Sequence, residues 1–332
     1  MKIITVGPGI NNKYARFFYA MDRKIRNGLI RLGHDVTHVS DRDIASNALG
    51  PRLLGKRLAN NKLLEVADAI HPDYLILFQA HIINPKTLFT LKKKLPNCKI
   101  ANIDNDLMYT EARFQRLLNL KKSIDVTFIT SAGEHLARLR REGLHIFYLP
   151  NCTDSSIEEG NPLDDINLSY DFVYFAGDVI QSPRWKLPLE IASIAPDIKC
   201  GFFGYGKTRI FGSNYFQILK TSKIALNWSM INDLHLYSSD RISQLFGTGR
   251  CVCLYAGSGF QRFINEGEAI FFTDANDLVR KIRTALHEDK WRQIAQKGQQ
   301  CYRILFNEKR VAQYIINVAF DIDISKYEWC DI

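Results

Sequence analysis

No apolar stretch of this 332-residue chain approaches the roughly 20 residues that a membrane-spanning helix needs. The chain runs from its first residue directly into an apolar segment, Lys2 to Val6, so we expect no signal peptide. Apolar residues make up 46% of the sequence and charged residues 24%, which is typical of a folded chain and not of a disordered one. The length suits two domains of roughly 150 residues each.

Cysteine is scarce, and the common motifs of cofactor and metal enzymes are missing. The seven cysteines are scattered and odd in number, as expected of reduced thiols in a cytoplasm. Cys251 and Cys253 share one face of an apolar segment, without a second Cys pair or a His at ligand spacing. This favours a core position over a metal site. No Walker A, HExxH or Ser/His/Asp pattern is present, and the loop GPGINN is not the GxGxxG of a NAD site.

The net charge of +9 is unevenly distributed. Residues 1–155 carry 24 Lys and Arg against 14 Asp and Glu, whereas residues 156–332 carry 20 against 21. A basic first half suggests an anionic partner, such as a phospholipid surface, a nucleic acid or a phosphorylated acceptor. A solvated basic face is the alternative explanation.

Apolar segments alternate with segments of helical periodicity along the chain. The first half has predicted strands at 3–6, 36–39, 74–78, 99–103, 126–129 and 145–149, with helices at 13–32, 53–70, 110–120 and 132–142 and another that begins at Pro85. The second half has predicted strands at 171–176, 199–203, 224–227, 251–253 and 269–272, with helices at 188–194, 215–221, 242–247, 277–287, 290–304 and 309–322. Such alternation implies parallel, doubly wound sheets.

The acidic, turn-rich residues 156–169 lack apolar periodicity, so we expect a linker there. It separates an N-terminal Rossmann-like domain, 1–155, from a second domain, 170–307, which is followed by a final helix and tail, 308–332. The predicted fold class is therefore α/β, with two Rossmann-like doubly wound domains. Their strand ends are expected to face one interdomain cleft, a favoured place for a ligand.

Two predicted loops have residues suited to anions. Gly7 and Gly9 follow the first strand, where glycine lets a backbone approach a ligand and a following helix favours negative charge. A plain tight turn is the alternative. Arg184 and Lys186 lie two residues apart after the first strand of the second domain and could neutralise a diphosphate. An ordinary exposed pair is the alternative there.

The stretch 237–278 combines a short helix, a buried strand, a glycine loop, a second strand and a new helix start. Such a stretch builds a ligand crevice at the carboxyl ends of strands. Asp240 is expected to cap the short helix while Arg241 reaches into the crevice. A surface salt bridge is the alternative role of Arg241.

Polar residues also follow two predicted strands of the first domain. Gln79 and His81 come after one strand, and Asp104 and Asp106 after another. A carboxylate or imidazole there could act as the general base on an acceptor hydroxyl. His81 could instead be a hydrogen-bonded loop residue, and Asp106 could cap the next helix.

Residues 120–305 resemble the GT-B glycosyltransferases of the group 1 type, closest to the CgeB-like or spore-maturation-like family. The matching segments in the second domain are Phe175-Ala-Gly177, Arg184, Gly204-Tyr-Gly206, residues 222–227, 241–249 and 267–274, the helix start Asp277-Leu278 and the helix 291–301. Residues 125–131 through Pro150 resemble the end of an acceptor domain. The first 120 residues match only in architecture.

The resemblance implies a glycosyltransferase that uses a nucleotide sugar as co-substrate, with no other cofactor and no metal. The second domain would bind the donor and the first a saccharide or lipid-linked acceptor, with the final helix crossing back to the first domain. The expected donor-binding residues are Gly177, Arg184, Lys186, Gly204, Tyr205, Gly206, Asn227, Arg241, Gln244, Ser258 and Gly259. Gly7 and Gly9 would form a phosphate or acceptor loop, and Asp104, Asp106 and His81 are the candidate catalytic residues.

One position departs from the family pattern. Where the family has Arg-x-x-Glu, this chain has Arg241-x-x-Gln244. A neutral amide still forms hydrogen bonds with hydroxyls but supplies no charge. Gln244 therefore leaves the donor, the stereochemistry and the presence of activity open.

The predicted function is sugar transfer in bacterial surface polysaccharide synthesis. The enzyme is expected in the cytoplasm, with peripheral contact at the inner face of the membrane through its basic first domain and without a nucleic-acid partner. One alternative is a nucleotide-sugar epimerase on the same two-domain frame. The other is a non-catalytic sugar- or nucleic-acid-binding module, which Gln244 and the basic half suggest.

Overall fold

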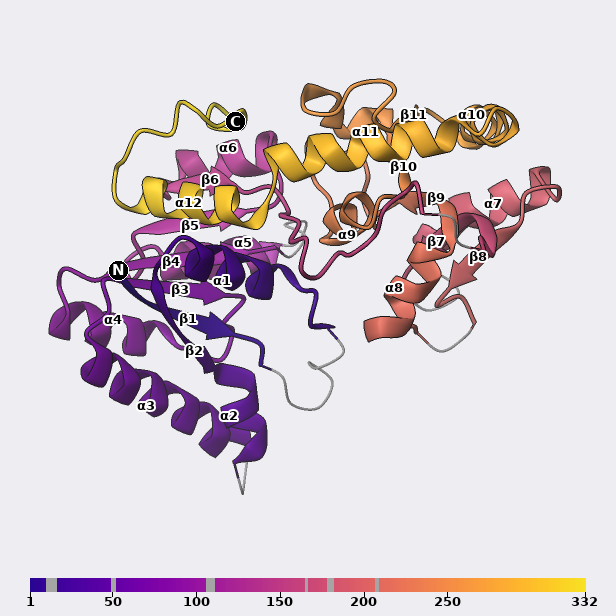
Figure 1. Ribbon diagram of the computed structural model, residues 1–332. Helices are drawn as coiled ribbons and strands as arrows, with labels where there is room; N and C mark the ends of the chain where they lie inside the picture. Colours follow the sequence, from indigo (N-terminus) through magenta and orange to yellow (C-terminus); the bar gives the residue numbers. More distant parts are fainter. Residues whose placement is uncertain (10–16, 49–51, 106–110, 165–166, 178–181, 207–208) are drawn as a thin grey trace. The chain divides into compact units, whose positions relative to one another are not determined.

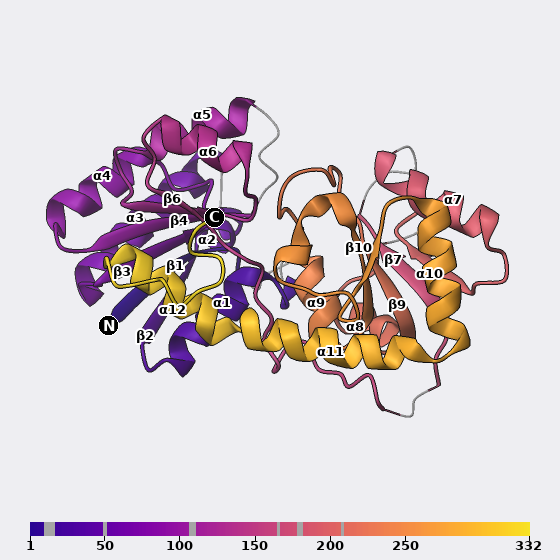
Figure 2. The same ribbon diagram turned by 90° about the horizontal axis from the view of Figure 1, so that it is seen from above.

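The computed structural model describes residues 1–9, 17–48, 52–105, 111–164, 167–177, 182–206 and 209–332. The chain divides into two compact units. Unit 1 consists of Met1–Pro150 together with Glu308–Ile332, and unit 2 consists of Asn151–Asn307. Each unit contains one parallel β-sheet with helices packed against it, as Figures 1 and 2 show. The predicted α/β class with two doubly wound sheets is confirmed.

The sheet of unit 1 has the strand order β2-β1-β3-β4-β5-β6, and all of its neighbouring strands are parallel. The strands are β1 (Lys2–Gly7), β2 (Asp35–Ser40), β3 (Tyr74–Phe78), β4 (Lys99–Asp104), β5 (Val126–Ile129) and β6 (Ile146–Tyr148). The order reverses at β1 and β3, because β1 continues to β2 on one side and β3 continues to β4 on the other.

Seven helices of the described residues belong to unit 1. They are α1 (Met21–Arg31), α2 (Asp41–Asn47), α3 (Arg52–Ile70), α4 (Pro85–Lys94), α5 (Glu111–Leu120), α6 (Glu134–Arg141) and α12 (Glu308–Ala319). Leu75 and Leu77 of β3 pack with Leu63 of α3 and Leu88 of α4 in one core cluster. The alternate residue Tyr74 points to the other face, where its hydroxyl donates to the carbonyl oxygen of Ile315 in α12 at 3.4 Å. Both faces of the sheet are therefore covered (Figure 1).

Two elements of unit 1 differ from the sequence prediction. Residues 17–20 form a turn and α1 begins at Met21, so the predicted helix 13–32 starts too early; residues 10–16 lie outside the described part of the chain. The helix α2 was not predicted. It is capped by Ser40, whose hydroxyl accepts from the backbone N–H of Asp43 at 3.2 Å. Its polar sequence DRDIASN has too little apolar periodicity to reveal a helix.

The C-terminal segment belongs to unit 1 and begins at Glu308, directly after the end of unit 2. Gly28 of α1 lies against this point, since a Cβ at Gly28 would come within 2.2 Å of the carbonyl oxygen of Glu308. The tail then returns to α12. Trp329 is fully buried, with its ring centroid 5.5 Å from that of Tyr314 and 5.2 Å from that of Tyr327. Aromatic packing therefore holds the tail on α12.

The sheet of unit 2 has the order β11-β10-β9-β7-β8, again with parallel neighbours. Its strands are β7 (Tyr170–Phe175), β8 (Cys200–Phe203), β9 (Ser222–Asn227), β10 (Cys251–Tyr255) and β11 (Ile270–Phe272). Its helices are α7 (Lys186–Ile194), α8 (Gly212–Lys220), α9 (Arg241–Gly247), α10 (Ala275–His287) and α11 (Lys290–Leu305), with 3-10 turns η2 (Pro183–Trp185), η3 (Ala256–Ser258) and η4 (Phe260–Arg262).

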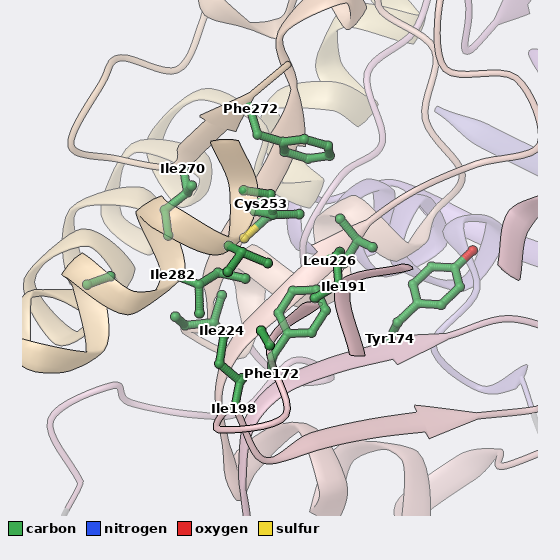
Figure 3. Packing of buried hydrophobic residues seen from close by; sticks show 14 of the residues in the cluster. Phe172, Tyr174, Ile191, Ile198, Ile224, Leu226, Cys253, Ile270, Phe272 and Ile282 are labelled. Atoms are coloured by element: carbon green, nitrogen blue, oxygen red, sulfur yellow. The ribbon is translucent and has the colours of Figure 1, made fainter. Parts of the chain in front are cut away.

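One buried face of this sheet packs against α7, α10 and α11, as Figure 3 shows for side chains such as Phe172, Leu226 and Ile282. Cys251 and Cys253 are fully buried in the same cluster, so the predicted core position of this pair is confirmed. All seven cysteines are free thiols in the structure.

The segment predicted to be a linker lies inside unit 2, which starts at Asn151. Ile157 and Glu158 are buried, and the Glu158 carboxylate accepts from the backbone N–H of Asp154 at 2.7 Å. Thr153 pairs with Asn307 in an isolated parallel bridge. Turn-rich composition marks an irregular backbone, but this segment packs into unit 2 through buried side chains such as Ile157 and Glu158.

Unit 1 carries the whole excess of positive charge. It has 27 Lys and Arg against 18 Asp and Glu, whereas unit 2 has 17 of each. In the ranges that the structure describes, no helix is both long and apolar enough to cross a membrane.

We expect Trp329→Ala to destabilise unit 1 by about 3–5 kcal/mol, because it empties a fully buried aromatic site. Chemical denaturation followed by circular dichroism measures the change. Ile322→Ala is the control, since that side chain is 50% exposed, and it should change the free energy of unfolding little. Equal stability of Trp329→Ala and the wild type would contradict the role of the tail.

Candidate functional site

The strand order of unit 2 reverses at β7 and β9, because β7 continues to β8 and β9 continues to β10. Arg241, the first residue of α9, lies at this point. Its Nη1 donates to the carbonyl oxygen of Phe175 at 2.7 Å and its Nη2 donates to that of Trp228. The guanidinium also lies 5.2 Å from the ring centroid of Tyr174. Arg241 thus joins the carboxyl ends of the two strands where open α/β sheets bind ligands.

The predicted alternative role of Arg241, a salt bridge, is not found among the described residues, because its partners are backbone carbonyls. These bonds fix the position of the guanidinium. Its Nε is buried without a hydrogen-bond partner in the part of the chain that the structure describes.

Gln244 lies one turn further along α9, and it is 6% exposed. Its Nε2 donates to a carboxylate oxygen of Asp240 at 3.3 Å, and the Ser243 hydroxyl donates to the other oxygen at 2.9 Å. Asp240 is at the N-cap position, but its side chain makes no hydrogen bond to the helix backbone, so the predicted cap is wrong. A glutamate in place of Gln244 would put two carboxylates side by side. The Gln244 amide can therefore donate to Asp240 without adding a second negative charge.

Gly204 follows β8 and must be glycine. Its φ is +105°, and a Cβ there would lie 1.8 Å from the carbonyl oxygen of Ala176, which follows β7. The two strand ends therefore touch through backbone atoms. Trp185 of η2 packs on this pair, with its ring centroid 5.2 Å from those of Tyr174 and Tyr205.

Arg184 precedes Trp185 in the same 3-10 turn. Gly177, two residues after the end of β7, lies against the guanidinium of Arg209, since a Cβ on Gly177 would be 3.0 Å from the Arg209 Cζ. Arg209 is exposed, and because it belongs to no motif the sequence does not identify it. Lys186 is exposed at the start of α7, and Gly206 follows Tyr205 with a φ of +57°.

Three further predicted donor residues lie at the ends of β9 and β10. Asn227 is 7% exposed and accepts from the Ser238 hydroxyl at 3.0 Å. The Ser258 hydroxyl donates to the carbonyl oxygen of Tyr255 at 2.6 Å. Gly259 lies against His235, with a distance of 2.5 Å between a Cβ built on it and the Nδ1 of the ring. These contacts hold the loops in place.

In unit 1, two of the three predicted catalytic residues meet at one cation. Asp104 is 2% exposed and accepts from Nη2 of Arg116 at 2.6 Å, and Nη1 of Arg116 lies 3.2 Å from Nε2 of His81. Arg116 is on α5, and no motif identified it. If Arg116 donates to Nε2, the lone pair that a general base would use is occupied. Asp106 lies outside the described residues.

Close packing accounts for both glycines of the first loop. A Cβ on Gly7 would lie 3.0 Å from the carbonyl oxygen of Phe78, which ends β3. A Cβ on Gly9 would overlap Ser40 and Asp43 at the start of α2. His38 of β2 holds the same loop through a contact of 3.0 Å between Nε2 and the carbonyl oxygen of Pro8.

A buried carboxyl group lies at the end of β2. Asp41 is fully buried, and neither carboxylate oxygen has a hydrogen-bond partner of normal geometry among the described residues. Burial raises its pKa to about 6, and the positive charge of Arg42 with the backbone N–H groups of Arg42 and Ile82 lowers it by less. The sequence gives no signal for this group, because a single Asp after a strand reads as a helix cap.

The described residues contain no group of three or more His, Cys, Asp or Glu side chains placed to hold a metal ion. The sequence expectation of a reaction without metal therefore stays a prediction.

Residues 185–317 match the family described as glycosyl transferase-like. This segment includes α9 with Arg241 and the loops after β8, β9 and β10. No curated protein matches the chain in sequence.

Solved structures match nearly the whole chain at low sequence identity. Sucrose-phosphate synthase from Thermosynechococcus elongatus is 14% identical, with 97% of this chain and 98% of that chain covered and a TM-score of 0.64. HepE from Anabaena, in complex with UDP and glucose, is 12% identical, with 97% and 100% covered and a TM-score of 0.60. A putative UDP-N-acetylglucosamine 2-epimerase from Listeria monocytogenes is 12% identical, with 96% of each chain covered and a TM-score of 0.55.

The solved structures bear out the predicted GT-B fold. Similarity to the glycosyl transferase-like family is confined to residues 185–317 and does not distinguish the CgeB-like family.

Asp41→Asn should stabilise the protein at neutral pH and not in acid. The folded state favours the neutral carboxyl, so this group's favourable contribution is complete below pH 3.8 and is lost as the pH rises through about 6. Removing the charge should therefore raise the free energy of unfolding by about 3 kcal/mol above pH 7 and by little below pH 4. Denaturation across this pH range measures it. Asp35→Asn, at an exposed position, is the control, and a gain that does not vary with pH would contradict the prediction.

Proposed function

We propose that the chain transfers a sugar from a nucleoside-diphosphate donor to a saccharide or lipid-linked glycan acceptor in the synthesis of a bacterial surface polysaccharide. The observation that carries this proposal is Arg241, which joins the ends of β7 and β9 at the reversal of the strand order. It lies in the segment that matches the glycosyl transferase-like family.

The donor would bind at the carboxyl ends of the strands of unit 2. HepE, which has a similar fold, was solved with UDP and glucose, and this supports a UDP-sugar as the donor. Arg184 and Lys186 would stabilise the diphosphate as it leaves the sugar, with Arg209 as a further cation beside Gly177. Fixed cations can meet the charge of the leaving group, so the proposed reaction needs no metal.

The acceptor would bind to unit 1. In the transfer, an acceptor hydroxyl oxygen forms a bond to the anomeric carbon, the bond from that carbon to the diphosphate breaks, and the hydroxyl proton passes to a base. His81 and Asp104 are the candidates, and Arg116 orients both of them. If the reaction inverts the anomeric centre, one of them would take the proton after Arg116 releases it.

The charge of unit 1 supports peripheral contact with an anionic membrane surface. Its excess of nine cationic residues is the net charge of the whole chain. Such a surface attracts a basic domain, and the attraction weakens with salt.

A second candidate function is nucleotide-sugar epimerisation, because the fold also matches a putative UDP-N-acetylglucosamine 2-epimerase. The reaction products distinguish sugar transfer from epimerisation. Transfer yields free nucleotide and a glycosylated acceptor, whereas epimerisation yields an altered nucleotide sugar with no acceptor present.

A thermal-shift panel of UDP-, GDP-, dTDP- and CMP-sugars tests donor binding, since a ligand that binds the folded state raises its apparent stability. We expect a shift with a UDP-sugar. Arg241→Ala should abolish that shift, because it frees the two strand-end carbonyls and removes the cation.

The control for Arg241→Ala is Arg280→Ala, an arginine of the same unit whose side chain is 70% exposed. It should bind like the wild type. Circular dichroism must show that Arg241→Ala is folded, since unpaired buried carbonyls each cost about 1–3 kcal/mol. Unchanged donor affinity in a folded Arg241→Ala protein would refute the donor site.

His81→Ala should lower kcat for transfer by about 10²-fold or more if His81 is the general base, and leave the UDP-sugar thermal shift unchanged. His81 is exposed, so its removal should not unfold unit 1. The exposed His287 of α10 provides the control variant, His287→Ala. A wild-type kcat in His81→Ala would exclude His81 as the base and leave Asp104 and Asp106.

A further inference from the structure

Unit 1 contains a cavity of about 1090 Å³, within the size range of small-molecule sites. It lies between α3, α4 and α5 at the carboxyl ends of β3 and β4. Its apolar wall includes Leu54 and Leu64 of α3 and Leu120 of α5, which are exposed or partly exposed. The cavity therefore has room and apolar surface for the hydrophobic part of a ligand.

Two buried hydrogen-bond donors in this wall lack a partner. Asn102 of β4 lines the cavity and is 2% exposed, and its Nδ2 has no hydrogen-bond partner among the described residues. Arg116 also lines the cavity, and its Nε is buried and unpartnered in the same part of the chain. Leaving such a donor unsatisfied costs about 1–3 kcal/mol, so these atoms indicate a ligand that offers acceptor oxygens.

The charge of the lining has one sign. Lys56 and Arg57 of α3 and Lys86 of α4 join Arg116 there, and none of the first three forms an ion pair with a described residue. Among the described residues that line the cavity there is no Asp or Glu. The N-terminus of α4, at Asn84, faces the same space and adds the positive end of a ten-residue helix. The lining therefore favours an anion.

One buried side chain of the lining joins two sides of the cavity. Asn60 of α3 is 5% exposed, and its Nδ2 donates to the carbonyl oxygens of Lys56 at 2.7 Å and Ile82 at 3.0 Å. Its Oδ1 accepts from the backbone N–H of Asn84 at 3.0 Å and from the Thr87 hydroxyl at 2.7 Å. The loop after β3 and the start of α4 are thus fixed to α3, which makes the cavity a preformed site.

We propose that this cavity binds an amphiphile with a phosphate head and an apolar chain, and that this amphiphile carries the acceptor of the transfer. The link to transfer rests on the proposed function and on His81, which lines the cavity and contacts Arg116. The phosphate oxygens accept from Arg57, Lys86, Asn102 and the Nε of Arg116. The apolar chain covers the leucine wall.

Isothermal titration calorimetry of the full chain with octyl phosphate, octyl glucoside and inorganic phosphate tests the proposal, with the amphiphiles below their micelle concentrations. Octyl phosphate should bind at least tenfold more tightly than either of the others, because only it offers both the anion and the chain. Its affinity should fall with added salt. If octyl glucoside or inorganic phosphate binds as tightly as octyl phosphate, the proposal is wrong.

Three variants and a matched control locate the binding. Arg57→Gln, Lys86→Gln and Asn102→Leu should each weaken octyl phosphate binding about tenfold, the loss of one charge-assisted or buried hydrogen bond. Asn102→Leu removes an unsatisfied buried amide, so the protein should remain folded. Lys93→Gln removes a charge from the same helix as Lys86, outside the cavity lining, and should bind like the wild type. Equal affinities in all four variants would place the amphiphile elsewhere and overturn the proposal.

Titration of the same preparations with UDP-glucose separates this inference from the proposed function. UDP-glucose binding without octyl phosphate binding would refute the cavity proposal and leave the transferase. Octyl phosphate binding with the predicted variant pattern but no nucleotide-sugar binding would support the cavity and refute the donor site.

Discussion

Every strand pair that the structure describes is parallel, so the carboxyl ends of each sheet meet along one edge. Where the strand order of such a sheet reverses, the connections after two neighbouring strands run to opposite sides. They leave a crevice between the two strand ends. In unit 2 that place is spanned by one side chain, because Arg241 donates to a carbonyl at the end of β7 and to another just after β9. In unit 1 the equivalent strand ends approach directly, with Gly7 against Phe78. The same topology therefore leaves a cation at one edge and a close backbone contact at the other.

The electrostatics around α9 depend on this arrangement. Arg241 has no carboxylate partner among the described residues, and the nearby Asp240 is bonded to Ser243 and Gln244. A glutamate at position 244 would compete with Asp240 for these donors and add a second negative charge at the head of the helix. The Asp240 carboxylate, four residues earlier in the chain, is thus the acceptor that the Gln244 amide meets.

The order and type of most strands and helices could be predicted, because apolar periodicity determines which segments are buried. The short polar helix α2 could not, since its sequence has almost no apolar face. The contacts between side chains were harder to predict from the sequence. Asp104 and His81 were chosen as residues at strand ends, but Arg116, which joins them, comes from the next helix and belongs to no motif. Long-range partners of this kind depend on tertiary packing, and a single sequence holds no periodic signal for them.

The two units differ in net charge. Unit 2 has as many acidic as basic residues, so an anion bound to it would depend on the local placement of single cations such as Arg241. Unit 1 has the whole excess of positive charge, and four of its cations line the cavity. Such a field attracts anions over about a Debye length, whereas the leucine wall acts only at contact. For a ligand with both a phosphate and an apolar chain, the electrostatic field would speed association and contact with the leucine wall would slow dissociation.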